Sequence, residues 1–422
     1  MKTRILALLT GLAAVLLSVA LILYFDPFSA IFDRVFLPAE VQSLSDVSVK
    51  CSWRSEEGLE PYSYAKSIIE QYFDCFYSAA GQKDFEGERI MESFYADSAV
   101  DCVYDLAAMK SGAVRLENGG IDLSFDGVDV YLRVKNVVEI NRDGVIIMLE
   151  QSAEPHYNAL QGIASGEGIY LHTFVFERYN GDWMITTHSC DGGAWSYARK
   201  AMKLLCGDNP PYGDLYEKYP LFCSGTAVNA KNVVALTAAA GYGPLPSAET
   251  AYNRAAALEY AKKWTSVNAP MRNTEVWDDY EQDSVNFVSQ CIFAGVGRMD
   301  TEGEYLWKWY DSKVEYNDPY SGCSRSWSAG ETFWRYCTGN SRVGLCTVTD
   351  AAGGQMEIGD VVQLMLGDDV LSQVIVTDVV TDTKGRTVEL LVSGHDDELV
   401  NYPLSAAHCD WVRMIKIVGF NS

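Results

Sequence analysis

The chain has 422 residues, a net charge of −24 at neutral pH, and 48% hydrophobic and 12% aromatic residues. This length exceeds the roughly 250–300 residues that one hydrophobic core usually serves, so we expect two domains. The hydrophobic content excludes a largely disordered chain. The acidic balance excludes nucleic acid as a partner, because its phosphates would be repelled.

The first segment has the pattern of a membrane anchor. Twenty residues without a charge run from Ile5 to Tyr24, about the length that a helix needs to cross a bilayer. Lys2 and Arg4 precede this run, so the positive-inside rule places the N-terminus in the cytoplasm. We predict a single-pass anchor over residues 1–28, a location at the cell membrane and an extracytoplasmic bulk. A cleaved signal peptide is the alternative, although the run exceeds the roughly 7–15 apolar residues of a signal core.

A juxtamembrane stalk with little pattern is expected over residues 29–59, followed by an α+β domain over 60–205. Apolar residues at helical spacing predict a helix from Tyr62 to about Ala79. Period-two alternation predicts strands over 128–134 and 144–150. A helix followed by a curved antiparallel meander resembles the cone-shaped fold of the nuclear transport factor superfamily.

A β-hairpin is predicted around Tyr179, Asn180 and Gly181, because Asn-Gly is the strongest short hairpin signal. His172 and His188 lie on its two strands and are expected to face each other. A catalytic or metal-binding pair would need a third group, and none is evident nearby in the sequence. We therefore interpret them as histidines whose hydrogen bonds are satisfied within the sheet.

Residues 206–250 are rich in Pro and Gly and are predicted to be a linker between domains. The second domain, 251–422, opens with a helix over 252–265 and continues with another that begins near Asp283. Residues 301–349 are expected to form long loops with short helices. Four strands follow, over 359–365, 374–380, 387–393 and 411–418. Helices followed by an antiparallel sheet is the order of a papain-like half-barrel, so the predicted fold class is α+β.

Several motifs of this second half resemble the bacterial putative amidase domain family in the same order. They are Y-N-R-A-A-A-L-E-Y-A-K-K-W at 252–264, D-S-V-N-F-V-S-Q at 283–290, S-R-S-W at 324–327, G-D-V-V-Q at 359–363, L-S-Q-V-I-V-T-D-V at 371–379, and L-L-V-S-G-H-D-D-E-L-V-N-Y-P-L at 390–404. The resemblance implies a papain-like amide hydrolase related to peptidases that cut bacterial cell walls. Such enzymes use a thiolate at a helix N-terminus, a histidine base and a third group that orients the histidine.

The sequence departs from this pattern at two of the three positions. The nucleophile position holds Ser284, where the family has a cysteine, and the base position holds Ser372, where the family has a histidine. Only His395 is retained, at the position of the third member. A serine hydroxyl needs an adjacent general base, and a second serine cannot act as one at neutral pH. Cys291 lies about 10 Å farther along the same helix and is interpreted as a core residue.

The resulting prediction is a membrane-anchored protein whose amidase-like domain has lost hydrolysis and binds wall peptides or serves as an interaction platform. Candidate ligand-binding residues are Asn286, Gln290 and Trp327. One alternative is an active amide hydrolase that pairs Ser284 with His395. Another is a structural partner protein in which the first domain does the binding.

No cofactor or metal site is expected. The chain has eleven cysteines, an odd number, and none of them forms a C-x-x-C motif. The spacings are too wide for a zinc knuckle. Disulfides are open at this point, because the spacing of cysteines does not give their pairing.

Overall fold

The computed structural model describes residues 46–81, 87–241, 243–302, 306–310 and 322–422. The predicted membrane anchor and most of the predicted stalk lie outside these residues. Within the described part of the chain, no helix is both long enough and apolar enough to span a membrane. Residues 43–422 form one compact unit.

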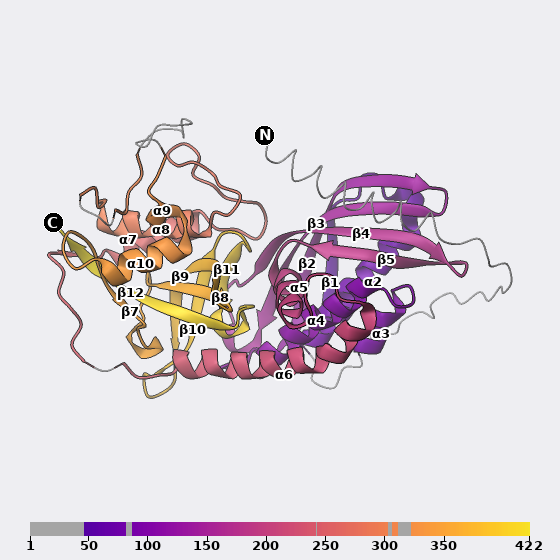
Figure 1. Ribbon diagram of the computed structural model, residues 1–422, viewed down its shortest axis with the longest axis horizontal. Helices are drawn as coiled ribbons and strands as arrows, with labels where there is room; N and C mark the ends of the chain where they lie inside the picture. The colour runs from indigo at the N-terminus through magenta and orange to yellow at the C-terminus, as the bar shows by residue number, and fades with distance from the viewer. Residues whose placement is uncertain (1–45, 82–86, 242, 303–305, 311–321) are drawn as a thin grey trace. The chain divides into compact units, whose positions relative to one another are not determined.

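The first half of this unit is built on a five-stranded sheet with the strand order β1-β2-β3-β4-β5. Strand β1 pairs with β2 in parallel, and the other neighbours are antiparallel. The strands are β1 (Ser48–Ser55), β2 (Phe125–Asn141), β3 (Gly144–Tyr157), β4 (Glu167–Tyr179) and β5 (Asp182–Cys190). Helices α2 (Ser63–Gly81), α3 (Gly87–Ser93) and α4 (Val100–Glu117) accompany it (Figure 1).

The predicted helix over 62–79 and the predicted hairpin are confirmed. Helix α2 buries Ile69, Tyr72, Phe73 and Phe76, which the helical period places on one face. Between β4 and β5, Asn180 and Gly181 have φ values of 52° and 99°. These positive angles are the ones that a two-residue type I′ turn requires, which explains the Asn-Gly pair.

Two expectations about irregular segments are wrong. The expected linker 206–250 contains α6 (Tyr212–Thr237), a helix of 26 residues. The prolines of this segment favoured a linker, but Pro211 stands at the N-cap, where no backbone N–H is needed. The expected stalk contains β1, whose lack of clean alternation matches its partly buried position at the sheet edge.

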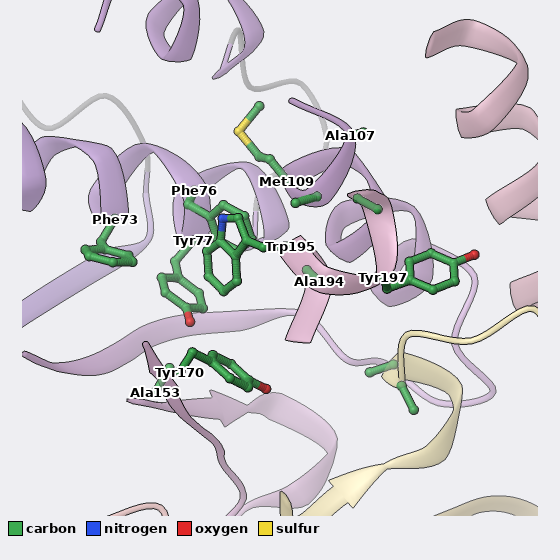
Figure 2. Packing of buried hydrophobic residues seen from close by; sticks show 14 of the residues in the cluster. Phe73, Phe76, Tyr77, Ala107, Met109, Ala153, Tyr170, Ala194, Trp195 and Tyr197 are labelled. Carbon is green, nitrogen blue, oxygen red and sulfur yellow. The ribbon is translucent and has the colours of Figure 1, made fainter. Parts of the chain in front are cut away.

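Helix α5 (Gly193–Cys206) joins the first core through its aromatic side chains. Trp195 stacks on Phe76 with ring centroids 4.3 Å apart, and its indole N–H donates to the hydroxyl of Tyr72 at 2.7 Å. Figure 2 shows Trp195 among Phe76, Tyr77 and Tyr170. Aromatic contacts of this kind add about 0.5–1.5 kcal/mol each beyond burial, so α5 is firmly fixed.

The second half is a curled antiparallel sheet with helices, as predicted. Its strand order is β11-β10-β9-β8-β12-β6, with β7 also paired to β12. The strands are β6 (Thr250–Ala251), β7 (Gly344–Thr349), β8 (Val361–Leu366), β9 (Asp369–Thr381), β10 (Thr387–Gly394), β11 (Leu399–Pro403) and β12 (Trp411–Asn421). The helices are α7 (Arg254–Lys263), α8 (Ser284–Val296), α9 (Arg325–Ser328) and α10 (Gly330–Gly339).

The two halves share one hydrophobic core cluster. Buried residues of α2, α4 and β2–β5 belong to the same cluster as Val362, Val374 and Leu390 of the second sheet. Arg115 of α4 is completely buried and donates to the carbonyl of Cys409. This continuity means that elements of the first half are positioned to contribute to a site in the second half.

Candidate functional site

Helix α8 begins at Ser284, the residue that the sequence motifs predict at the nucleophile position. Asp283 is the N-cap residue, and Gly297 ends the helix with a φ of 66°. Phe287, Val288 and Cys291 are completely buried in the second core. A helix buried this deeply has a fixed N-terminus, so the groups around Ser284 are held in place.

The Ser284 hydroxyl has two neighbours. Its Oγ accepts a hydrogen bond from the backbone N–H of Gln373 at 3.3 Å, and the hydroxyl also hydrogen-bonds the carboxylate of Asp396. Ser284 is buried, with 4% of its surface exposed.

Asp396 occupies the N-terminus of α8. Its Oδ1 accepts from the backbone N–H of Asp283 at 2.6 Å, and its Oδ2 accepts from the backbone N–H of Ser284 at 3.3 Å. Burial raises the pKa of Asp396, while its hydrogen bonds to Ser284 and Asp283 lower it. A helix N-terminus is a natural anion site, and here the protein supplies the anion itself.

His395 is turned toward Asp283 rather than Ser284. Its Nδ1 lies 2.6 Å from Oδ2 of Asp283, and its Nε2 lies 2.7 Å from the carbonyl oxygen of Trp264. Because a carbonyl only accepts, Nε2 carries a hydrogen, and a further proton lies between Nδ1 and the carboxylate. The ring also stacks on Phe287 at 3.9 Å. Both nitrogens are therefore engaged.

Arg272 completes the surroundings of this pair. Its Nε lies 3.4 Å from Oδ2 of Asp283, and its Nη2 donates to Oε1 of Glu398 at 2.5 Å. Burial raises the pKa of Glu398, and the Arg272 hydrogen bond lowers it. Residues 395–398 thus connect the second sheet with the start of α8. His395 and Asp396 contact α8 directly, and Glu398 binds Arg272, which in turn contacts Asp283.

The other four histidines have their partners elsewhere. His172 Nδ1 lies 3.0 Å from His188 Nε2, and His188 Nδ1 lies 2.6 Å from Oδ2 of Asp105. Burial, followed by the charge of His188, lowers the pKa of His172. The expectation of a facing, satisfied pair is confirmed, and Asp105 is the partner that the sequence did not reveal. His408 contacts Ser111 at 3.3 Å, and His156 pairs with Asp129 at 3.1 Å.

Ser372, which the sequence motifs predict at the base position, lies on β9 opposite Leu364 of β8. It is 4% exposed, and its Oγ has no hydrogen-bond partner among the described residues. The next residue, Gln373, is completely buried and accepts from Nε2 of Gln363 at 2.8 Å. Ser372 is therefore a buried hydroxyl with an unused donor and acceptor.

Ser284 and Ser372 line the same cavity, whose volume is about 480 Å³. Its walls come from the start of α8, the β8–β9 hairpin, the α9–α10 connection and α5. Cavities of roughly 300–1,000 Å³ are typical of small-molecule and peptide-fragment sites. Both serines that the motifs predict at reacting positions therefore line one cavity.

The three predicted ligand-binding residues are engaged within the protein. Asn286 Nδ2 donates to Oδ1 of Asp283 at 2.7 Å, and its Oδ1 accepts from Trp327 Nε1 at 2.8 Å. Gln290 accepts from the hydroxyl of Tyr260 at 2.7 Å. All three side chains are buried, and none lines the cavity among the described residues.

The sequence did not reveal two features of the site: the Asp396 carboxylate at the N-terminus of α8, and the lysines of α5 in the cavity lining. Asp396 follows His395 directly in H-D-D-E, and this acidic run was the available signal. Lys200 and Lys203 of α5 reach the cavity from a segment far away in the sequence. No sequence signal connected those lysines with Ser284.

The cysteines are unpaired, and the one nearest Ser284 along α8 is a core residue. All eleven cysteines are free thiols, and burial raises the pKa of Cys291 well above its ordinary value. Cys291 is completely buried, in agreement with its interpretation from the sequence. Across the described ranges, no group of three or more His, Cys, Asp or Glu residues could hold a metal ion.

A buried helix whose N-terminus carries Ser284, packed on a curled antiparallel sheet that carries Ser372, defines an amidase-like domain. Residues 251–418 match the family model described as "Putative amidase domain", so this segment of the chain is a domain of that family. This match confirms the family resemblance of the sequence motifs. No curated protein and no solved structure matches the chain significantly.

Proposed function

We propose that the protein is a membrane-anchored, extracytoplasmic binding protein whose amidase domain holds amide ligands such as wall peptides without cutting them. One observation carries this proposal. The carboxylate of Asp396 accepts the backbone N–H of Ser284, so the donor nearest the nucleophile position is already bonded to an anion.

Amide hydrolysis needs a nucleophile, a base and donors for the developing oxyanion. The hydroxyl of Ser284 has a carboxylate and a backbone N–H as partners. Its family base is replaced by Ser372, and His395 is bonded to Asp283 and Trp264. A fixed negative charge at the helix N-terminus would repel an oxyanion, which argues against the alternative Ser284–His395 enzyme.

Ligand binding is supported by the cavity and by Ser372 in its lining, whose buried hydroxyl has no partner among the described residues. A buried polar group without a partner costs about 1–3 kcal/mol, and a ligand that bonds to Ser372 Oγ would recover this free energy. The packing residues of α8 and β9 keep the cavity in shape. Loss of the reacting groups therefore leaves a binding cleft.

The proposed location rests on the sequence. The uncharged run from Ile5 to Tyr24 follows Lys2 and Arg4, and the positive-inside rule then directs the following chain outward. A location outside the membrane would expose the cleft to cell-wall peptides. If the protein is instead an interaction platform, its protein partner would occupy the same cleft and would also hydrogen-bond to Ser372.

A retention experiment tests the binding role. The full-length protein is immobilised and incubated with a soluble peptidoglycan digest, and the retained peptides are identified by mass spectrometry. Ser328→Trp, which fills the cavity wall, should abolish retention, while the exposed control Ser341→Trp should preserve it. Equal retention by both variants, or none by the unmodified protein, would contradict the proposal.

A further inference from the structure

Two ammonium groups of the first half line the cavity of the amidase domain. Lys200 and Lys203 are three residues apart on α5, so they share one helix face. The adjacent Arg199 pairs with Asp101 at 2.9 Å. In the described part of the chain, neither lysine has an acidic partner within ion-pair distance. In a protein with a net charge of −24, two unpaired cations on one cleft wall are notable.

The acidic groups of the cavity do not neutralise these lysines by direct contact. Asp396 directs both carboxylate oxygens to backbone N–H groups of α8. Asp369 is the exposed first residue of β9, where it can accept an N–H of a ligand. Lys200 acts at longer range on Asp397 and lowers the pKa of that carboxyl, although burial raises it to about 6 overall.

Helix α5 is held at the cleft by contacts on both sides. Asp397 Oδ1 accepts from the backbone N–H of Gly193, at the start of α5, at 3.0 Å. Asp397 directly follows Asp396, the residue that caps α8. Trp195 fixes the same helix in the first core. Two consecutive aspartates therefore connect the helix that carries the lysines with the N-terminus of α8: Asp397 binds the start of α5, and Asp396 binds the start of α8.

Ser372 adds a different kind of group to the cavity lining. Ser372 Oγ is buried and has no partner among the described residues, and it lines the same cavity as the two lysines. A peptide segment fits this combination, because its carbonyl or N–H satisfies a hydroxyl and its carboxylate satisfies ammonium groups. A neutral or cationic ligand would leave the lysines unpaired.

We propose that the first half of the protein determines the specificity of the cleft. Lys200 and Lys203 select amide ligands that carry a carboxylate. This inference rests on the proposed binding function and adds the chemical class of the ligand. Ser372 meets the amide portion of the ligand, and the lysines meet its carboxylate. Hydrogen bonds to charged groups are stronger than those between neutral groups, so loss of both lysines should weaken binding at least about tenfold.

The test compares one peptide pool in two chemical forms. A soluble peptidoglycan digest is used as it is and after its carboxylates have been converted to carboxamides with carbodiimide and ammonia. The immobilised full-length protein, Lys203→Gln, the double variant Lys200→Gln/Lys203→Gln and the control Lys231→Gln are compared. Lys231 is an exposed residue of α6 that does not line the cavity, so it matches the charge change. Lys203→Gln is included because Lys200, and not Lys203, acts on the carboxyl of Asp397, which holds the start of α5.

The expected result is retention of native peptides that falls at least about tenfold on amidation and in the double variant. Lys203→Gln should give a partial loss, and Lys231→Gln should give none. Equal retention of the native and amidated pools would overturn the carboxylate inference while leaving the binding function standing. Absence of retention in both forms by the unmodified protein would overturn the binding function and this inference together. Equal losses in Lys203→Gln and Lys231→Gln would show a net-charge effect and would also overturn the inference.

Discussion

Asp396 presents its carboxylate to the backbone N–H of Ser284, with 3.3 Å between Oδ2 and the nitrogen. The same carboxylate accepts the N–H of Asp283 at 2.6 Å. A thiolate or an oxyanion would need this region of positive potential at the start of α8. In this protein the Asp396 side chain occupies it, and our proposal of binding without cleavage rests on this contact.

Removal of this cap should destabilise the fold. Asp396→Ala leaves two backbone N–H groups without their acceptor and should lower the free energy of unfolding by about 1–2 kcal/mol. Urea unfolding followed by circular dichroism measures the change. Asp369→Ala, an exposed aspartate that lines the same cavity, serves as the control and should change stability by less than about 0.5 kcal/mol. Equal effects of the two variants would show that the cap is energetically unimportant.

His395 should be important for stability rather than for reactivity. His395→Ala removes the shortest side-chain contact of the buried Asp283 carboxylate, at 2.6 Å, and the free energy of unfolding should fall by about 2–4 kcal/mol. The control is His156→Ala, whose side chain is 62% exposed and pairs with Asp129; a change below about 0.5 kcal/mol is expected there. A fully stable His395→Ala protein would argue for a role in chemistry instead.

Glu167 should make stability depend on pH. Burial raises the pKa of Glu167 to about 7, although hydrogen bonds from Tyr170 and Tyr402 lower it. Because the unfolded chain releases this proton near pH 4.5, the folded state loses stability as pH rises from about 4.5 to 7. Glu167→Gln removes this loss, so the variant should gain stability relative to the unmodified protein between pH 5 and pH 8.

The gain should reach at most about 3 kcal/mol, since each pKa unit corresponds to about 1.4 kcal/mol. Unfolding curves of both proteins at pH 5 and pH 8 give the difference directly, and taking the difference cancels the other titrating groups. The exposed Glu60→Gln serves as the control and should show no such trend. A difference between variant and unmodified protein that stays constant with pH would contradict the assignment to Glu167.

Restoring the family residues should not be enough to restore hydrolysis. Ser284→Cys/Ser372→His supplies a thiol and a base, but the Asp396 carboxylate still occupies the helix N-terminus. A triple variant that adds Asp396→Ala frees the backbone N–H groups and should cleave wall peptides at least about tenfold faster than the double variant, because a missing oxyanion donor costs about 10²–10³ in rate. Peptide products are quantified by mass spectrometry. A double variant as fast as the triple variant would show that Asp396 does not block the site.

The sequence predicted most of the elements that carry strong periodicity or motifs. Helix α2, the Asn180–Gly181 hairpin and the strands β8 to β10 lie where their patterns indicated. It failed at α6, because the helix contains Pro220, Gly213 and Gly225, residues that normally interrupt a helical pattern. It also failed at α4, whose mixture of polar and apolar residues reflects burial against several neighbours at once.

The candidate site was predictable only where residues are close in the chain. Ser284 and Ser372 do line one cavity, as their motif positions suggested. The roles of Asp396 and Lys203 depend on long-range packing between β10–β11, α8 and α5, and no local pattern encodes such contacts. Asn286 and Trp327 were expected at the ligand, but they hydrogen-bond each other beneath α8.

Incorporation of ¹⁸O from labelled water tests the proposed loss of hydrolysis most directly, because hydrolysis of an amide adds one solvent oxygen to the new carboxyl group. Purified full-length protein and Ser284→Ala are each incubated with a peptidoglycan digest in H₂¹⁸O, and the peptides are weighed by mass spectrometry. We expect peptides to be retained and no label to enter them beyond the level of Ser284→Ala. Label that appears with the unmodified protein and disappears in Ser284→Ala would contradict the proposed binding role without cleavage.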